Sequence, residues 1–267
     1  MNDLFEVKRF GLLLKKTVSE RVLQLTGLTG LALIATFIIY SGVLYATDGM
    51  GHNLAQNLSF VWGIIGGGCF LSSIVFGYFS TNASGAAYLT LPASAFEKWL
   101  CGILIIGIFF PVVFLVFYRV MDTCFVMFYH NSLNKHAPRY TEMYNAVQVY
   151  TFDNNFAGQA IMIYVNFVTA MMVGSLYFNK VSAVKTALVY AGILAFIYFL
   201  NLVLAHAMFT NVDMAFPFHN IFIKVGSGVG SLELPATVSK IVFIAVQYII
   251  PGVLLLTTYI RLREKEI

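Results

Sequence analysis

Long apolar runs separated by short polar segments dominate the pattern of this 267-residue chain. A helix needs about 20 predominantly apolar residues to cross the hydrocarbon core of a bilayer. Six windows reach that length, at residues 25–46, 58–79, 100–121, 161–178, 184–208 and 241–260. The pattern therefore predicts an all-α integral membrane protein, with six transmembrane helices in a single transmembrane domain over residues 1–267.

Residues 1–23 follow a different, amphipathic pattern. Apolar residues recur at helical spacing on one stripe that also carries Gly11: Leu4, Val7, Leu14, Val18, Val22 and Leu25. Basic residues lie beside and behind it: Lys8, Arg9, Lys15 and Lys16. This pattern predicts an interfacial helix whose basic flank faces anionic headgroups. The alternative is a plain polybasic tether. No small-residue cleavage site follows the first span, so we expect the segment to be retained.

The placement of Lys and Arg predicts the orientation of the spans. Only 10% of residues are charged, and the net charge is +4. Eleven basic residues fall on the side of both termini: Lys8, Arg9, Lys15, Lys16, Arg21, Lys98, Lys180, Lys185, Arg261, Arg263 and Lys265. At most five fall on the other side, over longer loops. The positive-inside rule then places both termini in the cytoplasm.

Polar and small residues within the spans have two interpretations each. The polar ones are either hydrogen-bonded between helices or part of a translocation path: Asn166, Asn201, Gln247 and His206. The small ones allow close helix packing, within the bundle or across a dimer: Gly63, Gly67, Ser73 and Gly77.

No motif for chemistry stands out in the chain. The phosphate-binding pattern G-x-x-x-x-G-K-[ST] is missing, and no cytoplasmic segment is long enough for a nucleotide-binding domain. Cys69, Cys101 and Cys124 lack disulfide or zinc spacing, and His130 and His136 fit no metal pattern. We therefore expect no catalytic residue, no metal or cofactor bound by this chain and no nucleic-acid partner.

The link between the second and third spans, residues 80–99, is the most informative segment. Ser94 precedes Glu97 by three residues, which is the spacing of a capping box and predicts a helix start at Ser94. A short helix followed by a corner at Leu91-Pro92 should come before it. Such a link would present an exposed knob to a cytoplasmic partner.

The same segment carries a family resemblance. Residues 89–98, Leu-Thr-Leu-Pro-Ala-Ser-Ala-Phe-Glu-Lys, resemble the "L-x-L-P-x-S-x-x-E-K" link of ABC-2-type transporter permeases. Residues 176–186 resemble the family's inner loop between helices four and five. Residues 259–266 resemble the tail of a bacterial branch.

The resemblance implies a permease subunit of an ABC exporter, multi-pass in a bacterial inner (plasma) membrane. In that family two permeases, identical or different, assemble with two copies of a separate ATPase that binds ATP and magnesium. Residues 4–22 and 81–98 would contact the ATPase, and residues 212–236 would form a re-entrant element. The matching coupling residues are Thr81, Tyr88, Leu89, Leu91, Pro92, Glu97 and Lys98. The link departs from the family in its sparse charge, since only Glu97 and Lys98 could form salt bridges with a partner.

Two other classes of protein remain open from the sequence. A membrane scaffold or assembly subunit would pair Asn166, Asn201 and Gln247 within one chain and leave no shared cavity. A secondary transporter or channel would usually show a charge at mid-membrane, or an inverted repeat with broken helices. Neither feature is visible in the sequence.

Overall fold

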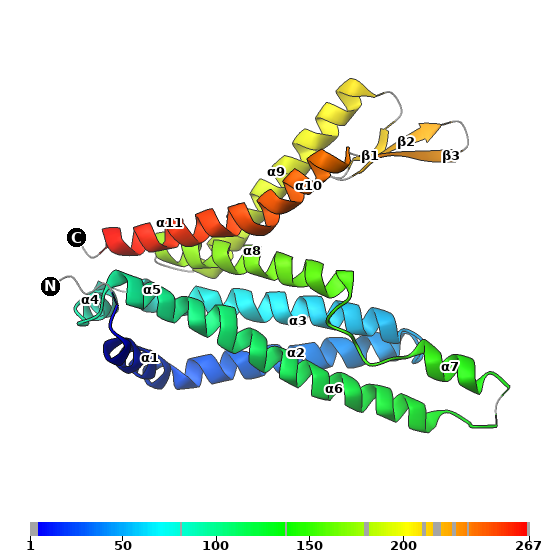
Figure 1. Cartoon of the computed structure of the whole chain (residues 1–267), viewed down its shortest axis with the longest axis horizontal. Coiled ribbons are helices and arrows are strands. Elements are labelled where there is room, and N and C mark those ends of the chain that lie inside the picture. Colours follow the sequence, from blue (N-terminus) through cyan, green and yellow to red (C-terminus); the bar gives the residue numbers. More distant parts are fainter. Residues whose placement is uncertain are drawn as a thin grey trace.

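Six long helices run along the molecule (Figure 1). The structure is a computed structural model that describes residues 5–80, 82–136, 138–178, 182–209, 212–215, 220–225, 228–233 and 235–265. The helices long and apolar enough to cross a membrane are Val22–Ala46, His52–Val75, Ala95–Ser132, Asn155–Tyr177, Ser182–Met208 and Thr237–Glu264. The prediction of a multi-pass membrane protein with six helical spans is thus confirmed.

The amino-terminal half of the chain contains α1 Val7–Glu20, α2 Val22–Ala46, α3 His52–Val75, the 3-10 turn η1 Gly77–Ser80, α4 Asn82–Leu89, α5 Ala95–Ile103, the π-helical turn η2 Leu104–Phe109 and α6 Phe110–Ser132. The rest contains α7 Tyr140–Ala146, α8 Asn155–Tyr177, α9 Ser182–Met208, three strands, α10 Ala236–Ile244, the π-helical turn η3 Ala245–Ile249 and α11 Ile250–Glu264. The third span is longer at both ends than residues 100–121, because α5, η2 and α6 form one continuous helix.

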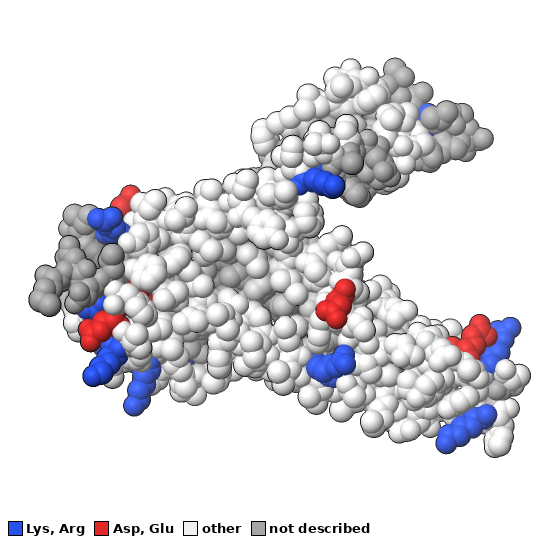
Figure 2. All heavy atoms as spheres, in the orientation of Figure 1, with Lys and Arg blue, Asp and Glu red and all other residues white. Residues whose placement is uncertain are grey.

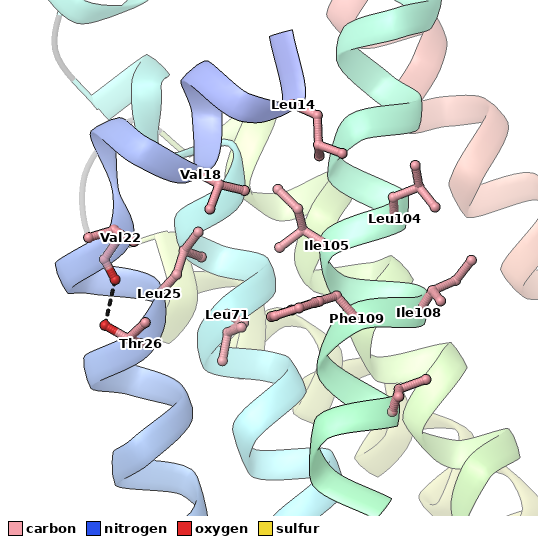
Figure 3. Close-up of a pocket in the computed structure, with 11 residues that line it drawn as sticks. Leu14, Val18, Val22, Leu25, Thr26, Leu71, Leu104, Ile105, Ile108 and Phe109 are labelled. Atoms are coloured by element: carbon pink, nitrogen blue, oxygen red, sulfur yellow. Dashed lines mark hydrogen bonds between the residues drawn. The ribbon is translucent and has the colours of Figure 1, made fainter. Parts of the chain in front are cut away.

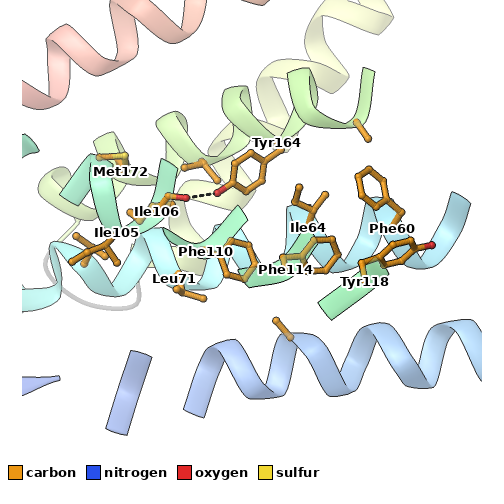
Figure 4. Packing of buried hydrophobic residues seen from close by; sticks show 14 of the residues in the cluster. Phe60, Ile64, Leu71, Ile105, Ile106, Phe110, Phe114, Tyr118, Tyr164 and Met172 are labelled. Carbon is orange, nitrogen blue, oxygen red and sulfur yellow. Dashed lines mark hydrogen bonds between the residues drawn. The ribbon is translucent and has the colours of Figure 1, made fainter. Parts of the chain in front are cut away.

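Helices α3 and α8 form the centre of the bundle. Aromatic rings from α3, α6 and α8 stack along them, and each of these side chains is almost fully buried (Figure 4): Phe60, Phe110, Phe114, Tyr118 and Tyr164. Glycines let these rings approach the backbone of α3. A Cβ on Gly67 would lie 2.5 Å from the Phe110 ring and 2.8 Å from the Ala32 methyl. The core therefore depends on close packing of aromatic rings against the glycine backbone of α3.

The two π-helical turns η2 and η3 each precede a proline, and each is hydrogen-bonded by α8. Each precedes a proline, Pro111 in α6 and Pro251 in α11, which lacks an N–H and crowds the preceding turn. A widened turn relieves that clash and leaves backbone carbonyls for other donors. The Tyr164 hydroxyl donates to the Ile106 carbonyl in η2 at 2.6 Å. The Asn166 amide donates to the Val246 carbonyl in η3 at 3.0 Å. Side chains of α8 thus donate hydrogen bonds to a backbone carbonyl in each π-helical turn.

A small antiparallel sheet connects α9 to α10. Its strands are β1 Val212–Ala215, β2 Asn220–Val225 and β3 Gly228–Glu233, in the order β1-β2-β3. Ile221 pairs with Leu232 and Ile223 with Gly230. The apolar, β-branched run of β2 favours a strand. The spans agree with the predicted all-α membrane fold, to which this sheet is a small local addition, and the re-entrant depth predicted for residues 212–236 stays a prediction.

The molecule divides toward one end into two projecting parts. Helices α9 and α10 carry the sheet away from the bundle, whereas α6 and α7 extend past the other helices (Figure 1). Helix α1, α4 and the last turn of α11 lie together at the opposite end, which we call the basic end. Figure 2 shows a broad, mostly uncharged surface along the spans, with one group of Lys and Arg at the basic end and others at the tips of the two projecting parts.

Candidate functional site

The link between α3 and α5 begins the candidate site at the basic end. The Ser94 hydroxyl accepts from the Glu97 backbone N–H at 3.2 Å, and the Glu97 carboxylate accepts from the Ser94 N–H at 2.9 Å. This reciprocal pair is the predicted capping box, and it starts α5. It also fixes the Glu97 carboxylate at the corner between the link and the third span.

Glu97 joins this corner to α1. Its side chain is fully buried and accepts from Arg9 Nε at 2.8 Å, from Arg9 Nη2 at 2.8 Å and from the Glu6 backbone N–H at 2.8 Å. A carboxylate with two guanidinium and two backbone donors is well satisfied despite its burial. We call Glu6, Arg9, Ser94 and Glu97 the clamp, because they fasten α1 to the start of α5.

Lys98 holds the other side of the link. Its side chain is buried, its ammonium donates to the Leu89 carbonyl at 3.1 Å, and it lies 5.7 Å from the centre of the Tyr88 ring. Leu89 is the last residue of α4, where backbone carbonyls lack helical partners and favour a cation. Lys98 thereby fastens the end of α4 to α5.

Arg21 connects the same link to the joint between α1 and α2. Its guanidinium lies 3.4 Å from the centre of the Tyr78 ring and donates to the Ile74 carbonyl. The Tyr78 ring stacks on that of Tyr88 with centroids 4.3 Å apart. Burial raises the pKa of the Tyr78 phenol, so this ring stays neutral. Cation–π contact and stacking therefore join α1, α3 and α4 in one unit.

Glu97 and Lys98 are not available for contacts with a partner. Both were expected to offer salt bridges to a partner, yet both are buried and engaged within the chain. Among the link side chains that the structure describes, Ala87, Thr90 and Pro92 are exposed, while Leu89 and Leu91 are half-buried. Thr81 lies outside the described residues. A hollow of about 200 Å³ separates α1 from α4 and is lined by Lys16, Glu20, Tyr78, Ala87, Tyr88 and Leu91.

Helix α1 packs on the bundle through a face beside the predicted apolar stripe. Leu13 and Thr17 are its buried residues, and they face the bundle. Val7 of the predicted stripe is 74% exposed and Val18 is 37% exposed. The stripe is therefore only partly exposed, because Leu14 is half-buried and packs against the core. Its predicted contact with lipid stays a prediction.

A buried carboxylate near the opposite end lies outside the set of predicted site residues. Asp122 of α6 accepts from the Tyr40 hydroxyl at 2.9 Å, the Gln56 amide at 2.9 Å and the Tyr150 backbone N–H at 2.7 Å. It thereby ties α2, α3 and the segment before α8 to α6. The one available signal was an Asp close to the end of an apolar run. A charge there is rare without partners.

The four polar span residues do not gather in one place. Asn166 donates to η3, and the Asn201 amide donates to the Ala215 carbonyl of β1 at 3.1 Å. The His206 ring donates to the Leu202 carbonyl of its own helix at 2.9 Å. Gln247 lies in a polar hollow of about 400 Å³ at the start of α8, with Asn154, Asn155 and Gln159. Three of the four side chains therefore satisfy backbone carbonyls within the chain.

Only part of the predicted small-residue face packs inside the bundle. A Cβ on Gly63 would strike Thr36 and the Phe114 ring, so Gly63 and Gly67 pack inside the bundle. Ser73 bonds to the Phe70 carbonyl of its own helix, and Gly77 lies next to Arg21. The sequence missed Gly68, whose Cβ would strike the Tyr164 ring and approach Val168 to 2.9 Å.

The loop histidine His130 acts as a structural link. Its Nε2 donates to the carbonyls of Tyr144 and Val147 at 3.1 and 2.9 Å, and its ring stacks on Tyr144 at 3.9 Å. These contacts hold α7 against the end of α6. Within the described ranges, no three His, Cys, Asp or Glu side chains gather as metal ligands would.

Comparison with known proteins identifies no relative. No protein-family model matches the chain, no curated protein matches its sequence and no solved structure matches its fold. A functional proposal must therefore rest on this chain's own residues and geometry.

Proposed function

We propose that this chain is the permease subunit of an ABC-2-type transporter that exports an unidentified substrate across a bacterial inner membrane. The observation that carries the proposal is the clamp. Glu97 fastens α1 to the first turn of Ala95–Ser132, a helix of 38 residues. A force applied to the link would therefore act on a helix that crosses the whole bilayer.

The division of the link into buried and exposed residues supports a docking role. Lys98, Glu97 and Tyr88 hold the link rigid from inside. Thr90 and Pro92 remain on its surface, next to the hollow between α1 and α4. Because the link is rigid, a displacement of its exposed tip by a partner would move the attached helices rather than deform the link. In this proposal, closure of two partner ATPases on ATP and magnesium pushes the tip and rocks the spans.

The energy source in this proposal lies on another chain, since the sequence has no phosphate-binding loop. A second permease, identical or different, would complete the transporter. Helix α9 leaves a surface free for that second chain, because none of its most apolar window is buried against the described residues. Close contact with a second chain would cover it.

A scaffold or assembly subunit is the second candidate, and one observation favours it. Asn166 and Asn201 both satisfy backbone carbonyls within the chain, as a protein without a translocation path would require. Gln247 favours transport instead, because it lines a polar hollow. A transport assay separates the two candidates only once a substrate is known, so partner capture is the first test.

The test is co-purification in mild detergent, with Pro92→Trp compared against His136→Trp. Both positions are exposed, and they lie at opposite ends of the molecule. We expect the unchanged chain and His136→Trp to recover a cassette ATPase, and Pro92→Trp to recover roughly tenfold less, as for an interface hot spot. An unchanged melting temperature would show that Pro92→Trp still folds. Failure of the unchanged chain to recover an ATPase, or equal recovery by both variants, would contradict the proposal.

A further inference from the structure

An apolar groove lies between α1–α2 and the helix formed by α5, η2 and α6. It has a volume of about 500 Å³, within the usual range of small-ligand sites. Aliphatic and aromatic side chains line it (Figure 3): Leu14, Val18, Val22, Leu25, Leu71, Leu104, Ile105, Ile108, Phe109 and Val112. The hydroxyl of Thr26, the one polar side chain in the lining, is bonded to the Val22 carbonyl at 2.6 Å. The groove therefore presents no unpaired side-chain donor.

The π-helical turn shapes one wall of this groove. Leu104, Ile105, Ile108 and Phe109 all belong to η2 and line the groove, and Ile105 and Phe109 point toward α2 (Figure 3). Ile108 and Phe109 are 56% and 65% exposed, so the groove opens sideways from the protein. At this depth in a membrane protein, the medium at a sideways opening is the acyl region of the bilayer.

The groove is level with the bilayer half at the basic end. It is lined by the first turns of α2, the last turns of α3 and the start of the third span, all of which lie beside α1. Lys8 and Lys15 are exposed and two helical turns apart on α1, and Lys15 lies one turn before Val18 of the groove lining. Neither ammonium forms an ion pair with any described residue, whereas Lys16 pairs with Glu20 at 3.6 Å.

We infer that the groove binds one acyl chain of an anionic phospholipid, with Lys8 and Lys15 meeting the headgroup. The apolar lining matches hydrocarbon, and the two ammonium groups match a phosphate at the membrane surface. The inference is independent of the proposed transport function.

The test compares Val112→Trp with Val116→Trp. These valines are one turn apart on α6 and 55% and 61% exposed, but only Val112 lines the groove. The full chain is reconstituted in vesicles of equal phosphatidylglycerol and phosphatidylcholine, and retained lipid is counted by native mass spectrometry. We expect one retained phosphatidylglycerol per chain, unchanged in Val116→Trp. Val112→Trp should retain roughly tenfold less, the factor expected from about two fewer buried methylenes.

A second pair of variants tests the headgroup. Lys8→Gln with Lys15→Gln should abolish the preference for phosphatidylglycerol over phosphatidylcholine, whereas Lys135→Gln in the opposite loop should preserve it. Equal melting temperatures would show that all variants fold. Equal lipid retention by the two tryptophan variants would overturn the inference, as would equal retention of both lipids by the unchanged chain. Loss of a protein dimer in Val112→Trp, with no lipid retained by the unchanged chain, would assign the groove to a second copy instead.

Discussion

The central helices α3 and α8 differ sharply from α9, although all three are long enough to span a membrane. Half of the most apolar window of α3 and 61% of that of α8 are buried within the protein, against none of the window of α9. Composition does not separate them, since all three are strongly apolar. In a bilayer, lipid covers an apolar helix as well as protein does, so burial here depends on shape and polar partners. Glycines and satisfied polar groups make α3 and α8 central.

The same contrast extends to the surroundings of each helix. We call α2, α3, α5, η2, α6, α8, η3 and α11 the body, and α9, the sheet and α10 the arm. In the body, Asp122 joins three elements through hydrogen bonds of 2.7 to 2.9 Å. In the arm, Asn201 joins α9 only to the neighbouring strand β1. We expect changes in the body to alter global stability, and changes in the arm to alter local order.

The largest expected effect follows from removing the Asp122 carboxylate. Asp122→Ala leaves the Tyr40 hydroxyl, the Gln56 amide and the Tyr150 N–H without their acceptor. At roughly 1 kcal/mol for each unsatisfied donor, we expect a loss of about 3 kcal/mol in the free energy of unfolding. Thermal unfolding in detergent, followed by circular dichroism, measures it.

The control for this prediction is Asp153→Ala, an exposed carboxylate in the segment before α8. A substitution at such a position should change the free energy of unfolding by no more than about 0.5 kcal/mol. If Asp122→Ala and Asp153→Ala had the same melting temperature, the stability of the body would not depend on the Asp122 carboxylate. The contrast with the arm would then fail.

Three consecutive glycines in α3 give the next largest effect. A Cβ on Gly68 would strike the Tyr164 ring and lie 2.9 Å from Val168, whereas one on Gly66 would meet nothing within 4 Å. Gly68→Ala should cost about 1–3 kcal/mol through overpacking. Gly66→Ala should be neutral or stabilising by up to about 1 kcal/mol, since alanine favours a helix. Equal melting temperatures of these two variants would show that α3 and α8 pack loosely.

How much the sequence predicts follows from the same physics. The number and rough extent of the spans are readable from it, because a bilayer demands about 20 apolar residues per crossing. The capping box at Ser94 was also predictable, since its donors and acceptors are three residues apart. Both features depend on local sequence alone.

Features made by distant residues were not predictable in this way. The partner of Glu97 is Arg9, 88 residues earlier, and no local pattern indicates that pairing. The packed face of α1 was not predicted either, because Leu13 and Thr17, which pack on the bundle, lie beside the larger apolar stripe that was expected to face lipid. In a membrane protein the most apolar face is free to meet lipid, so apolarity alone does not identify the packed side.

The smallest expected effect concerns the arm. Asn201→Leu removes the hydrogen bond from α9 to the Ala215 carbonyl and leaves this buried carbonyl without that donor. Interhelical hydrogen bonds in membranes contribute about 0.6 kcal/mol on average. The global melting temperature of Asn201→Leu should therefore differ from that of the unchanged chain by no more than the measurement error. Amide hydrogen exchange should rise in the described strands, residues 212–215 and 220–225, and stay unchanged in α3. Val203→Leu, at a half-exposed position of the same helix, is the control and should leave the strands unaffected. A fall in global stability comparable to that of Asp122→Ala would mean that the arm folds together with the body, and the division between them would have to be abandoned.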